Sequence, residues 1–267
     1  MFFIHAQSGI QWHYDCEGEG KPLVFLHGWG VDRRVWRQQC KYFSRSFQVL
    51  AFDLPGHGKS DWREISLEQI AGDLIHIFET LDLKDIVTVG SSLGGLLSIH
   101  IFREDPKRIK KMVLVGAMPK FVRAQDYPCG LTAEDVLKLA GMLQRDYPSM
   151  VHIFFRSLFT ARERSSRRFK WIQKFRQNDS VPAKDALLHF LNILMREDLR
   201  EVLERVHLPM QFINGDQDYI CALKTIGYLK TLQPRGRFDF FRDCGHFPFL
   251  SKPYEFNAVL EEFLKEI

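Results

Sequence analysis

The sequence has few cysteines and no long apolar run, and both shortages exclude classes of protein. Its five cysteines are scattered, and none forms a C-x-x-C pair. We therefore expect free thiols in a reducing compartment, the cytoplasm, and no metal site. No apolar run approaches the ~20 residues that a membrane-spanning helix needs. The first residues also lack the basic start and cleavage site of a secretory signal.

The composition is that of an ordinary globular protein. The chain has 267 residues, of which 45% are hydrophobic and 26% are charged, with a net charge of +4. This length fits one large domain, or one domain with an insertion. Nothing in the sequence implies an organic cofactor, and we expect a monomer.

Strands and helices alternate over most of the chain. An edge hairpin over residues 1–20 comes first, with a turn at Ser8 and Gly9. Short apolar runs predict buried strands at residues 23–26, 47–52, 86–89, 112–115, 210–214 and 238–241. Helices are predicted between them at 36–43, 66–81, 95–102 and 223–232, and from Pro253 onward; Ser66 and Gln69 form a capping box. This alternation predicts an α/β fold with a mostly parallel sheet flanked by helices.

The alternation stops between residues 119 and 184. This stretch shows helical periods without a convincing strand, and it carries 13 Lys/Arg against 6 Asp/Glu, a net of +7. We therefore predict a core of residues 1–118 and 185–267, interrupted by a helical lid of residues 119–184.

Residues 90–94 read G-S-S-L-G and fit the pattern G-x-S-x-G between a strand and an apolar helix. In this pattern the serine stands at a strained, sharp turn, and its hydroxyl is exposed above the sheet. Ser92 is therefore the candidate nucleophile, and the following helix N-terminus suits an oxyanion. A turn without any catalytic role would fit this five-residue motif equally well. The choice between the two interpretations therefore depends on whether the chain also offers a base and an acid for Ser92.

A serine nucleophile needs a base and a group that orients the base, here in the order serine, acid, histidine. Asp218 follows the strand at 210–214 and is the candidate acid, with Asp216 as the alternative. His246 follows the strand at 238–241 and is the candidate base. Both lie just beyond a strand's carboxyl end, the edge where α/β proteins bind ligands.

An oxyanion hole needs two N–H donors. The residue after the nucleophile supplies one, here Leu93, and the loop after the first central strand supplies the other. That loop reads H-G-W-G at 27–30, and Trp29 is the candidate. We interpret His27 as a structural residue that bonds neighbouring loops.

These stretches together resemble the α/β-hydrolase superfamily. The resemblance rests on H-G-W-G, on D-L-P-G-H-G-K-S at 53–60, on G-S-S-L-G-G, on G-D-Q-D at 215–218 and on C-G-H-F-P-F at 244–249. It implies the α/β-hydrolase fold with an inserted helical lid. A serine at position 92 excludes the members that use an aspartate nucleophile.

Within the superfamily the chain most resembles the pimeloyl-[acyl-carrier protein] methyl ester esterases of biotin synthesis. Further support comes from P-K-F-V-R-A-Q-D-Y-P at 119–128. The resemblance implies Ser92, Asp218 and His246 as the triad and Trp29 and Leu93 at the oxyanion. It also implies an acyl channel in which the lid residues Phe154, Phe155, Arg156, Ser157 and Leu158 contact the substrate. The other predicted substrate-binding residues are Trp29, Ser92, Leu93 and His246. That family commonly has tryptophan before the nucleophile, whereas this chain has Ser91.

The basic residues of the lid suggest a partner surface. Most of them fall within residues 156–176, and Arg164 and Arg168 stand four apart, on one face of a predicted helix. An acidic acyl-carrier protein would be attracted to such a face, and Arg156, Arg164 and Arg168 are the candidate docking residues. A plain solvated face explains the cluster equally well. Nucleic acid or an anionic membrane surface would also suit basic helices with aromatics, but nothing else in the sequence supports nucleic acid.

The sequence thus predicts a serine carboxylesterase that hydrolyses the methyl ester of a carrier-bound pimeloyl chain through an acyl-enzyme. One alternative is the activity of another member of the α/β-hydrolase superfamily: a general short-chain carboxylesterase, a carbon–carbon bond hydrolase or a lyase of menaquinone synthesis. Another alternative is a binding protein with this fold and no catalysis.

Overall fold

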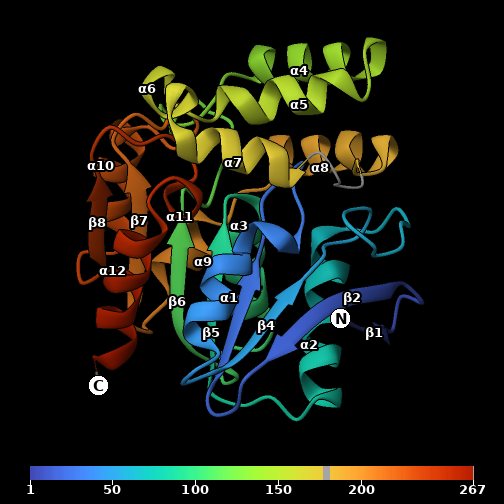
Figure 1. Ribbon diagram of the computed structural model, residues 1–267, viewed down its shortest axis with the longest axis vertical. Coiled ribbons are helices and arrows are strands. Elements are labelled where there is room, and N and C mark those ends of the chain that lie inside the picture. Colours follow the sequence, from blue (N-terminus) through green and yellow to red (C-terminus); the bar gives the residue numbers. More distant parts are fainter. Residues whose placement is uncertain (177–180, 267) are drawn as a thin grey trace.

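A mostly parallel sheet runs through the centre of the molecule (Figure 1). The computed structural model describes residues 1–176 and 181–266, without the side chains of Phe175 and Arg176, so residues 177–180 of the predicted lid lie outside the described residues. Within them the sheet has eight strands in the order β1-β2-β4-β3-β5-β6-β7-β8. The strands are β1 Phe2–His5, β2 Gln11–Glu17, β3 Pro22–Leu26, β4 Gln48–Phe52, β5 Ile86–Ser91, β6 Ile109–Val115, β7 Met210–Gly215 and β8 Arg237–Phe241.

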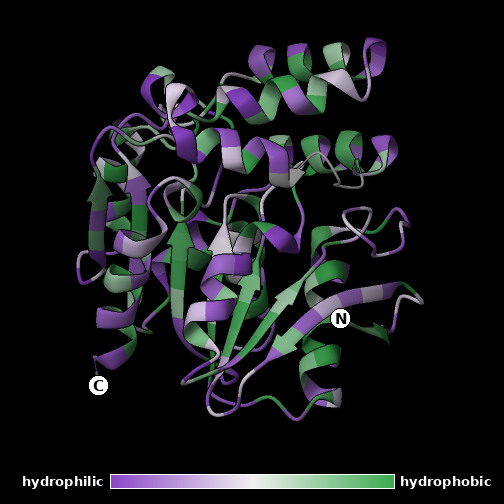
Figure 2. Cartoon of the chain, viewed as in Figure 1, coloured by the Kyte–Doolittle hydropathy of each residue, from purple (hydrophilic) through white to green (hydrophobic). Residues whose placement is uncertain are grey.

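The predicted edge hairpin is confirmed. β1 and β2 pair antiparallel, and β2 pairs antiparallel with β4. From β4 to β8 all neighbours are parallel. The central strands β3, β5 and β7 are buried throughout, because helices cover both faces of the sheet. Figure 2 shows the apolar character of β5 and β6 along most of their length.

Helices form a layer on each face of the sheet (Figure 1). On one face α1 (Arg37–Phe43), which follows the short helix η1 (Arg33–Trp36), packs on α12 (Pro253–Lys265). On the other, α2 (Leu67–Thr80) packs on α3 (Leu93–Glu104). The remaining helices of these layers are α9 (Arg200–Glu204), α10 (Leu223–Leu232) and α11 (Pro248–Ser251). The capping box of Ser66 and Gln69 at the start of α2 is confirmed.

A group of helices lies beyond the carboxyl ends of the strands (Figure 1). We call it the cap; its members are α4 (Ala133–Arg145), α5 (Ser149–Ser157), α6 (Ala161–Ser165), α7 (Arg167–Arg176) and α8 (Lys184–Arg196). The predicted lid ends where α8 begins, yet α8 packs on α4. We therefore infer that the insertion extends through α8.

The expectation that Arg164 and Arg168 share a helix face is wrong. α6 ends at Ser165, and Ser166 is extended with ψ 156° before α7 begins. The break places the two arginines on different helices, α6 and α7, so they do not form one face four residues apart. In the described part of the chain, no helix combines the length and the apolar character that a bilayer crossing requires.

Candidate active site

Ser92 stands at the turn between β5 and α3. Its backbone has φ +52° and ψ −113°, a conformation that is strained for a residue with a side chain. A Cβ at Gly94 would come within 2.3 Å of the Leu26 carbonyl oxygen, so only glycine lets α3 approach β3 this closely. The strain expected from the G-x-S-x-G pattern is therefore present at Ser92.

Asp218 and His246 form a buried pair beside this turn. The distance from His246 Nδ1 to Asp218 Oδ2 is 2.7 Å. The other carboxylate oxygen of Asp218 accepts hydrogen bonds from the N–H groups of Ile220 and Cys221. In the tautomer that carries its proton on Nδ1, His246 donates to Asp218 and has Nε2 free to act as a base.

Asp216, the alternative acid, has a different partner. Its Oδ1 accepts a hydrogen bond of 3.1 Å from the N–H of Cys244, two residues before His246. It braces the backbone of the histidine loop and makes no hydrogen bond to the imidazole in the described structure. The geometry therefore favours Asp218 as the residue that orients His246.

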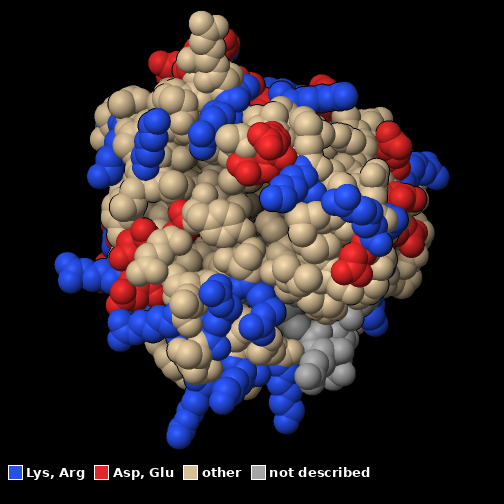
Figure 3. All heavy atoms as spheres, turned by 90° about the horizontal axis from the view of Figure 1, so that it is seen from above, with Lys and Arg blue, Asp and Glu red and all other residues tan. Residues whose placement is uncertain are grey.

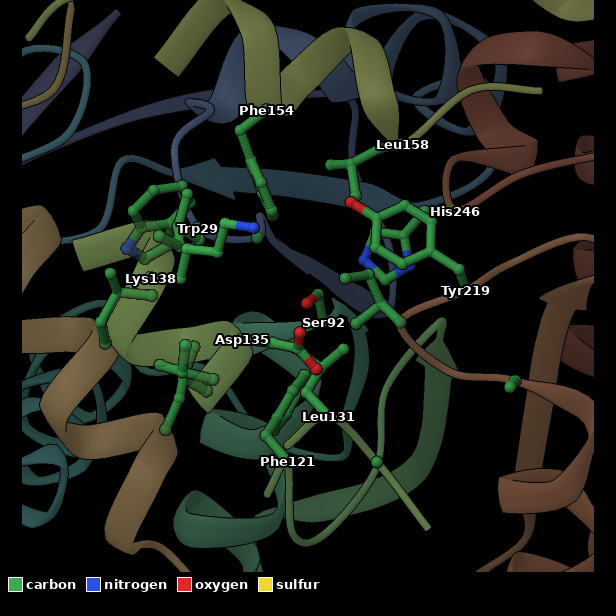
Figure 4. Close-up of a pocket in the computed structure, with 18 of the residues that line it drawn as sticks. Trp29, Ser92, Phe121, Leu131, Asp135, Lys138, Phe154, Leu158, Tyr219 and His246 are labelled. Carbon is green, nitrogen blue, oxygen red and sulfur yellow. The ribbon is translucent and has the colours of Figure 1, made fainter. Parts of the chain in front are cut away.

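Ser92 and His246 face the same cavity (Figure 4). Ser92 is 8% exposed and His246 is 3% exposed. No hydrogen bond joins Ser92 Oγ to His246 in the described structure. Such contacts are often loose in hydrolases without substrate and tighten when substrate binds.

Two main-chain donors border this site. Leu93 is the first residue of α3, and Trp29 lies in the turn after β3. Within the described residues, neither N–H donates a hydrogen bond to another group. The Trp29 indole is fixed by a hydrogen bond of 2.9 Å to the Leu187 carbonyl on α8. Its ring also meets the Phe154 ring edge-on, with centroids 5.0 Å apart.

Two buried histidines form hydrogen bonds with the backbone of the turn that contains Trp29. His27 Nδ1 lies 2.8 Å from the Gly28 carbonyl, and its Nε2 accepts from the N–H of Leu54. His57 Nε2 accepts from the N–H of Gly30. Burial lowers the pKa of His27 to about 4 and the pKa of His57 to about 3, so both rings are neutral at physiological pH. The structural interpretation of His27 is confirmed by these bonds.

The cavity at Ser92 has a volume of about 450 Å³ and mostly apolar walls. Of the predicted substrate-binding residues, it is lined by Trp29, Ser92, Phe154, Leu158 and His246. The lining does not include Leu93, Phe155, Arg156 and Ser157. Phe154 on α5 and Leu158, the residue just after this helix, are four residues apart and lie on one side of it, whereas the three residues between them do not line the cavity. Phe155 packs on the rings of Phe159 and Phe247, and Ser157 bonds the Tyr219 hydroxyl.

Several lining residues were not predicted from the sequence. They come from the segment before α4, from α4 and α8, and from the loop after Asp218: Phe121, Arg123, Leu131, Asp135, Val136, Lys138, Leu139, Met142, Leu191, Leu194, Tyr219 and Ile220. Figure 4 shows Phe121 and Leu131 across the cavity from Phe154 and Leu158. The apolar period of α4 was the available signal, but a period cannot distinguish a cavity wall from a packed core.

Ser91, the residue before the candidate nucleophile, does not line this cavity. It is fully buried at the end of β5, and its hydroxyl has no hydrogen-bond partner in the described structure. The Ser91 side chain is therefore part of the packing behind the nucleophile.

The three predicted docking arginines differ in their surroundings. Arg168 Nε donates to the Leu250 carbonyl at 2.7 Å, and its guanidinium also bonds Gln38 and stacks on Trp171. Arg164 donates to the Phe159 carbonyl. Arg156 is exposed and lies over the Phe169 ring. Figure 3 shows Lys and Arg side chains gathered along one side of the cap face.

The fold and the serine turn define this chain as an α/β hydrolase. A family model described as alpha/beta hydrolase fold matches residues 21–253, and the chain belongs to this family. Among the described residues, no group of three or more His, Cys, Asp or Glu is placed to hold a metal ion.

Several proteins that match nearly the whole chain are named pimeloyl-[acyl-carrier protein] methyl ester esterase. The protein of that name from Nitrosomonas europaea is 33% identical over 93% of this chain and 98% of its own length. The one from Vibrio campbellii is 30% identical over 94% and 97%. Among solved structures, an esterase from Exiguobacterium antarcticum has a TM-score of 0.90 at 24% identity, covering 99% of both chains. A bromoperoxidase from Bacillus anthracis has a TM-score of 0.89 at 25% identity, covering 99% of this chain and all of its own.

Proposed function

We propose that this protein is a serine carboxylesterase that hydrolyses the methyl ester of pimeloyl-[acyl-carrier protein] in biotin synthesis. The observation that carries the proposal is the full-length similarity to esterases of that name. The paired Asp218 and His246 beside Ser92, at one cavity, support it.

The residues of the site would divide the reaction as follows. Ser92 Oγ attacks the ester carbonyl carbon while His246 Nε2 takes the hydroxyl proton. The N–H groups of Leu93 and Trp29 stabilise the negative oxygen of the tetrahedral intermediate. His246 then gives the proton to the departing methoxy oxygen, which leaves as methanol. Asp218 holds the imidazole in the required orientation and stabilises its charged form.

Water completes the cycle. His246 takes a proton from the water molecule, whose oxygen attacks the acyl carbon bound to Ser92. The new intermediate collapses, His246 returns the proton to Ser92 Oγ, and the pimeloyl carboxylate is released. The net reaction is ester plus water giving carboxylic acid plus methanol.

The cavity suits a flexible aliphatic chain. Its volume of about 450 Å³ lies in the range of small-molecule sites, and its walls are mostly apolar, with five leucines and five aromatic residues among them. Arg123, Asp135 and Lys138 are exposed residues at its border, where a chain tethered to a carrier would leave the protein. A methyl ester at Ser92 with the carrier outside satisfies both ends of the substrate.

The cap is the proposed docking surface for the carrier. The predicted lid of residues 119–184 has a net charge of +7, and acyl-carrier proteins are acidic. Because Arg164 and Arg168 are bonded to main-chain carbonyls, Arg156 is the best placed of the three predicted arginines. The five free cysteines are consistent with a protein that functions in the reducing cytoplasm. We retain the prediction of a monomer.

Growth without biotin tests the proposed role. A bacterial strain that lacks this esterase should grow without biotin when it expresses this chain, and it should fail to grow when it expresses Ser92→Ala. Absence of growth with abundant folded wild-type protein would refute the biotin role. An ester panel then separates the alternative: free short-chain esters cleaved as fast as the carrier-bound ester would indicate a general carboxylesterase.

A further inference from the structure

The loop that carries His246 is held by the cap as well as by the sheet. The N–H of His246 donates a hydrogen bond of 2.8 Å to the Leu158 carbonyl at the end of α5. The N–H of Gly245 donates a hydrogen bond of 3.0 Å to Glu163 Oε2 on α6. Two successive main-chain groups at the candidate base are therefore bonded to residues of the insertion that precede them by 82 and 88 positions.

Glu163 has two tasks at this point. It is the third residue of a capping box, in which its N–H donates to Thr160 Oγ1 at 3.1 Å and its Oε2 accepts from the N–H of Thr160 at 2.6 Å. The same Oε2 accepts the bond from Gly245. One carboxylate oxygen thus joins the start of α6 to the histidine loop.

Capping alone does not explain the bond to Gly245. In the capping boxes of α2 and α4, the corresponding residues are Gln69 and Asp135. Within the described residues, their side chains bond only to the serine or threonine of their own box. Glu163 is also less exposed than Gln69 and Asp135, because the histidine loop covers it.

The rest of the histidine loop is fixed from the opposite side. Asp216 accepts the N–H of Cys244, and Asp218 accepts the Nδ1 proton of His246. These contacts hold the loop on its sheet side. They do not hold its cap side, where a contact could set the distance between the His246 ring and Ser92. The bonds from Gly245 and His246 to the cap fill that role.

We propose that Glu163 is a positioning residue for hydrolysis: its carboxylate holds the N–H of Gly245 and thereby sets the approach of His246 Nε2 to Ser92. The inference rests on the proposed hydrolase function of Ser92 and His246. Because a displacement of about 1 Å in a catalytic group can cost roughly a hundredfold in rate, one hydrogen bond beside the base is sufficient to affect turnover.

The test compares Glu163→Ala and Glu163→Gln with the wild type on p-nitrophenyl butyrate. Glu163→Ala should lower kcat about tenfold to a hundredfold and change KM less than about threefold, because it disturbs the base and leaves the cavity walls intact. Glu163→Gln keeps an amide oxygen that can accept from Gly245, and it should restore most of kcat. The rate at which a fluorophosphonate modifies Ser92 should fall in parallel with kcat, since this reaction also needs the base.

Thr160→Ala is the matched control. It removes the other bond of the same capping box and leaves the carboxylate of Glu163 in place. It should lower Tm through the loss of this one capping bond while kcat stays near that of the wild type. The proposal is overturned if Glu163→Ala lowers Tm without lowering kcat, or if Thr160→Ala lowers kcat equally.

Labelling separates this inference from the proposed function. If fluorophosphonate labels the wild type but not Ser92→Ala, and the pimeloyl ester is not cleaved, the biotin role fails while the labelling rates still decide the role of Glu163. If the wild type is not labelled at Ser92, both proposals fail.

Discussion

Gly116, just after β6, lies directly against the imidazole of His246. A Cβ at this position would come within 2.9 Å of both Nδ1 and Cε1 of the ring and within 3.2 Å of Asp218 Oδ2. Gly116 also has a backbone φ of +55°, which residues other than glycine rarely adopt. The pairing of His246 with Asp218 therefore depends on the absence of a side chain at the position just after β6.

Replacement of Gly116 by alanine should disturb this pair. We expect Gly116→Ala to lower kcat on p-nitrophenyl butyrate by about tenfold or more. It should also lower the free energy of unfolding by about 1–2 kcal/mol from backbone strain alone. Gly72→Ala is the control, because a Cβ at that helical position meets nothing within 4 Å. It should stabilise the protein by roughly 0.5–1 kcal/mol and leave kcat unchanged. Equal kcat in both variants would contradict the account.

The two candidate acids should differ in their effect on turnover. Asp218→Asn removes the acceptor that fixes the Nδ1 proton of His246, so kcat should fall by about 10⁴-fold, as expected when the imidazole takes the wrong tautomer. Asp216→Asn weakens only the bond to the Cys244 N–H and should lower kcat by less than about tenfold. Steady-state kinetics of the two purified variants provides the comparison. A larger loss in Asp216→Asn would reverse the assignment of the acid.

The buried histidines below the Trp29 turn should make stability depend on pH. The pKa of His27 is lowered to about 4 and that of His57 to about 3, whereas both rings titrate near 6.5 when the chain is unfolded. At pH values between the native and the unfolded pKa, the unfolded chain binds more protons than the native protein does. The free energy of unfolding therefore falls as pH falls below about 6.5. Each ring contributes a slope of up to about 1.4 kcal/mol per pH unit.

Urea unfolding at a series of pH values from 7 to 5 measures this slope. His57→Gln keeps a polar side chain but removes one titrating group, so its stability should vary less steeply with pH than that of the wild type. An unchanged slope in His57→Gln would show that His57 is not a neutral buried ring in the native protein.

Arg156 and Arg168 should respond differently to substitution. Arg168→Ala leaves the Leu250 carbonyl without its donor, and it should lower the free energy of unfolding by about 1–3 kcal/mol. Arg156→Ala should leave stability nearly unchanged, because Arg156 is exposed. On carrier-bound ester it should raise KM and weaken the dependence of kcat/KM on salt. Identical KM values for Arg156→Ala and the wild type would exclude Arg156 from the docking surface.

Local sequence was sufficient for most of the elements. The helix at 223–232, the capping box at Ser66 and the strained turn at Ser92 were predicted because each depends on residues within a few positions of one another. The pairing of Asp218 with His246 followed from the known chain order of such sites. The edge of a parallel sheet brings the ends of its strands together.

The parts that were missed depend on contacts between distant segments. Nothing in the local pattern shows that Ser166 breaks the helix between Arg164 and Arg168, since serine also occurs within helices. The cavity walls from α4 and α8 depend on how the cap is set on the core. The bond from Gly245 to Glu163 joins residues 82 positions apart, and its acceptor has an ordinary capping role in the sequence.

The central claim is that Ser92 catalyses hydrolysis of pimeloyl-carrier protein methyl ester. The most direct test measures this hydrolysis for the wild type and Ser92→Ala at low and high salt. The account predicts methanol release that falls by about 10⁴-fold or more in Ser92→Ala, and a kcat/KM that exceeds the value for free dimethyl pimelate and decreases with salt. Undiminished turnover in Ser92→Ala would contradict the catalytic assignment. Ser92-dependent cleavage of free esters, with none of the carrier-bound ester, would contradict the biotin role.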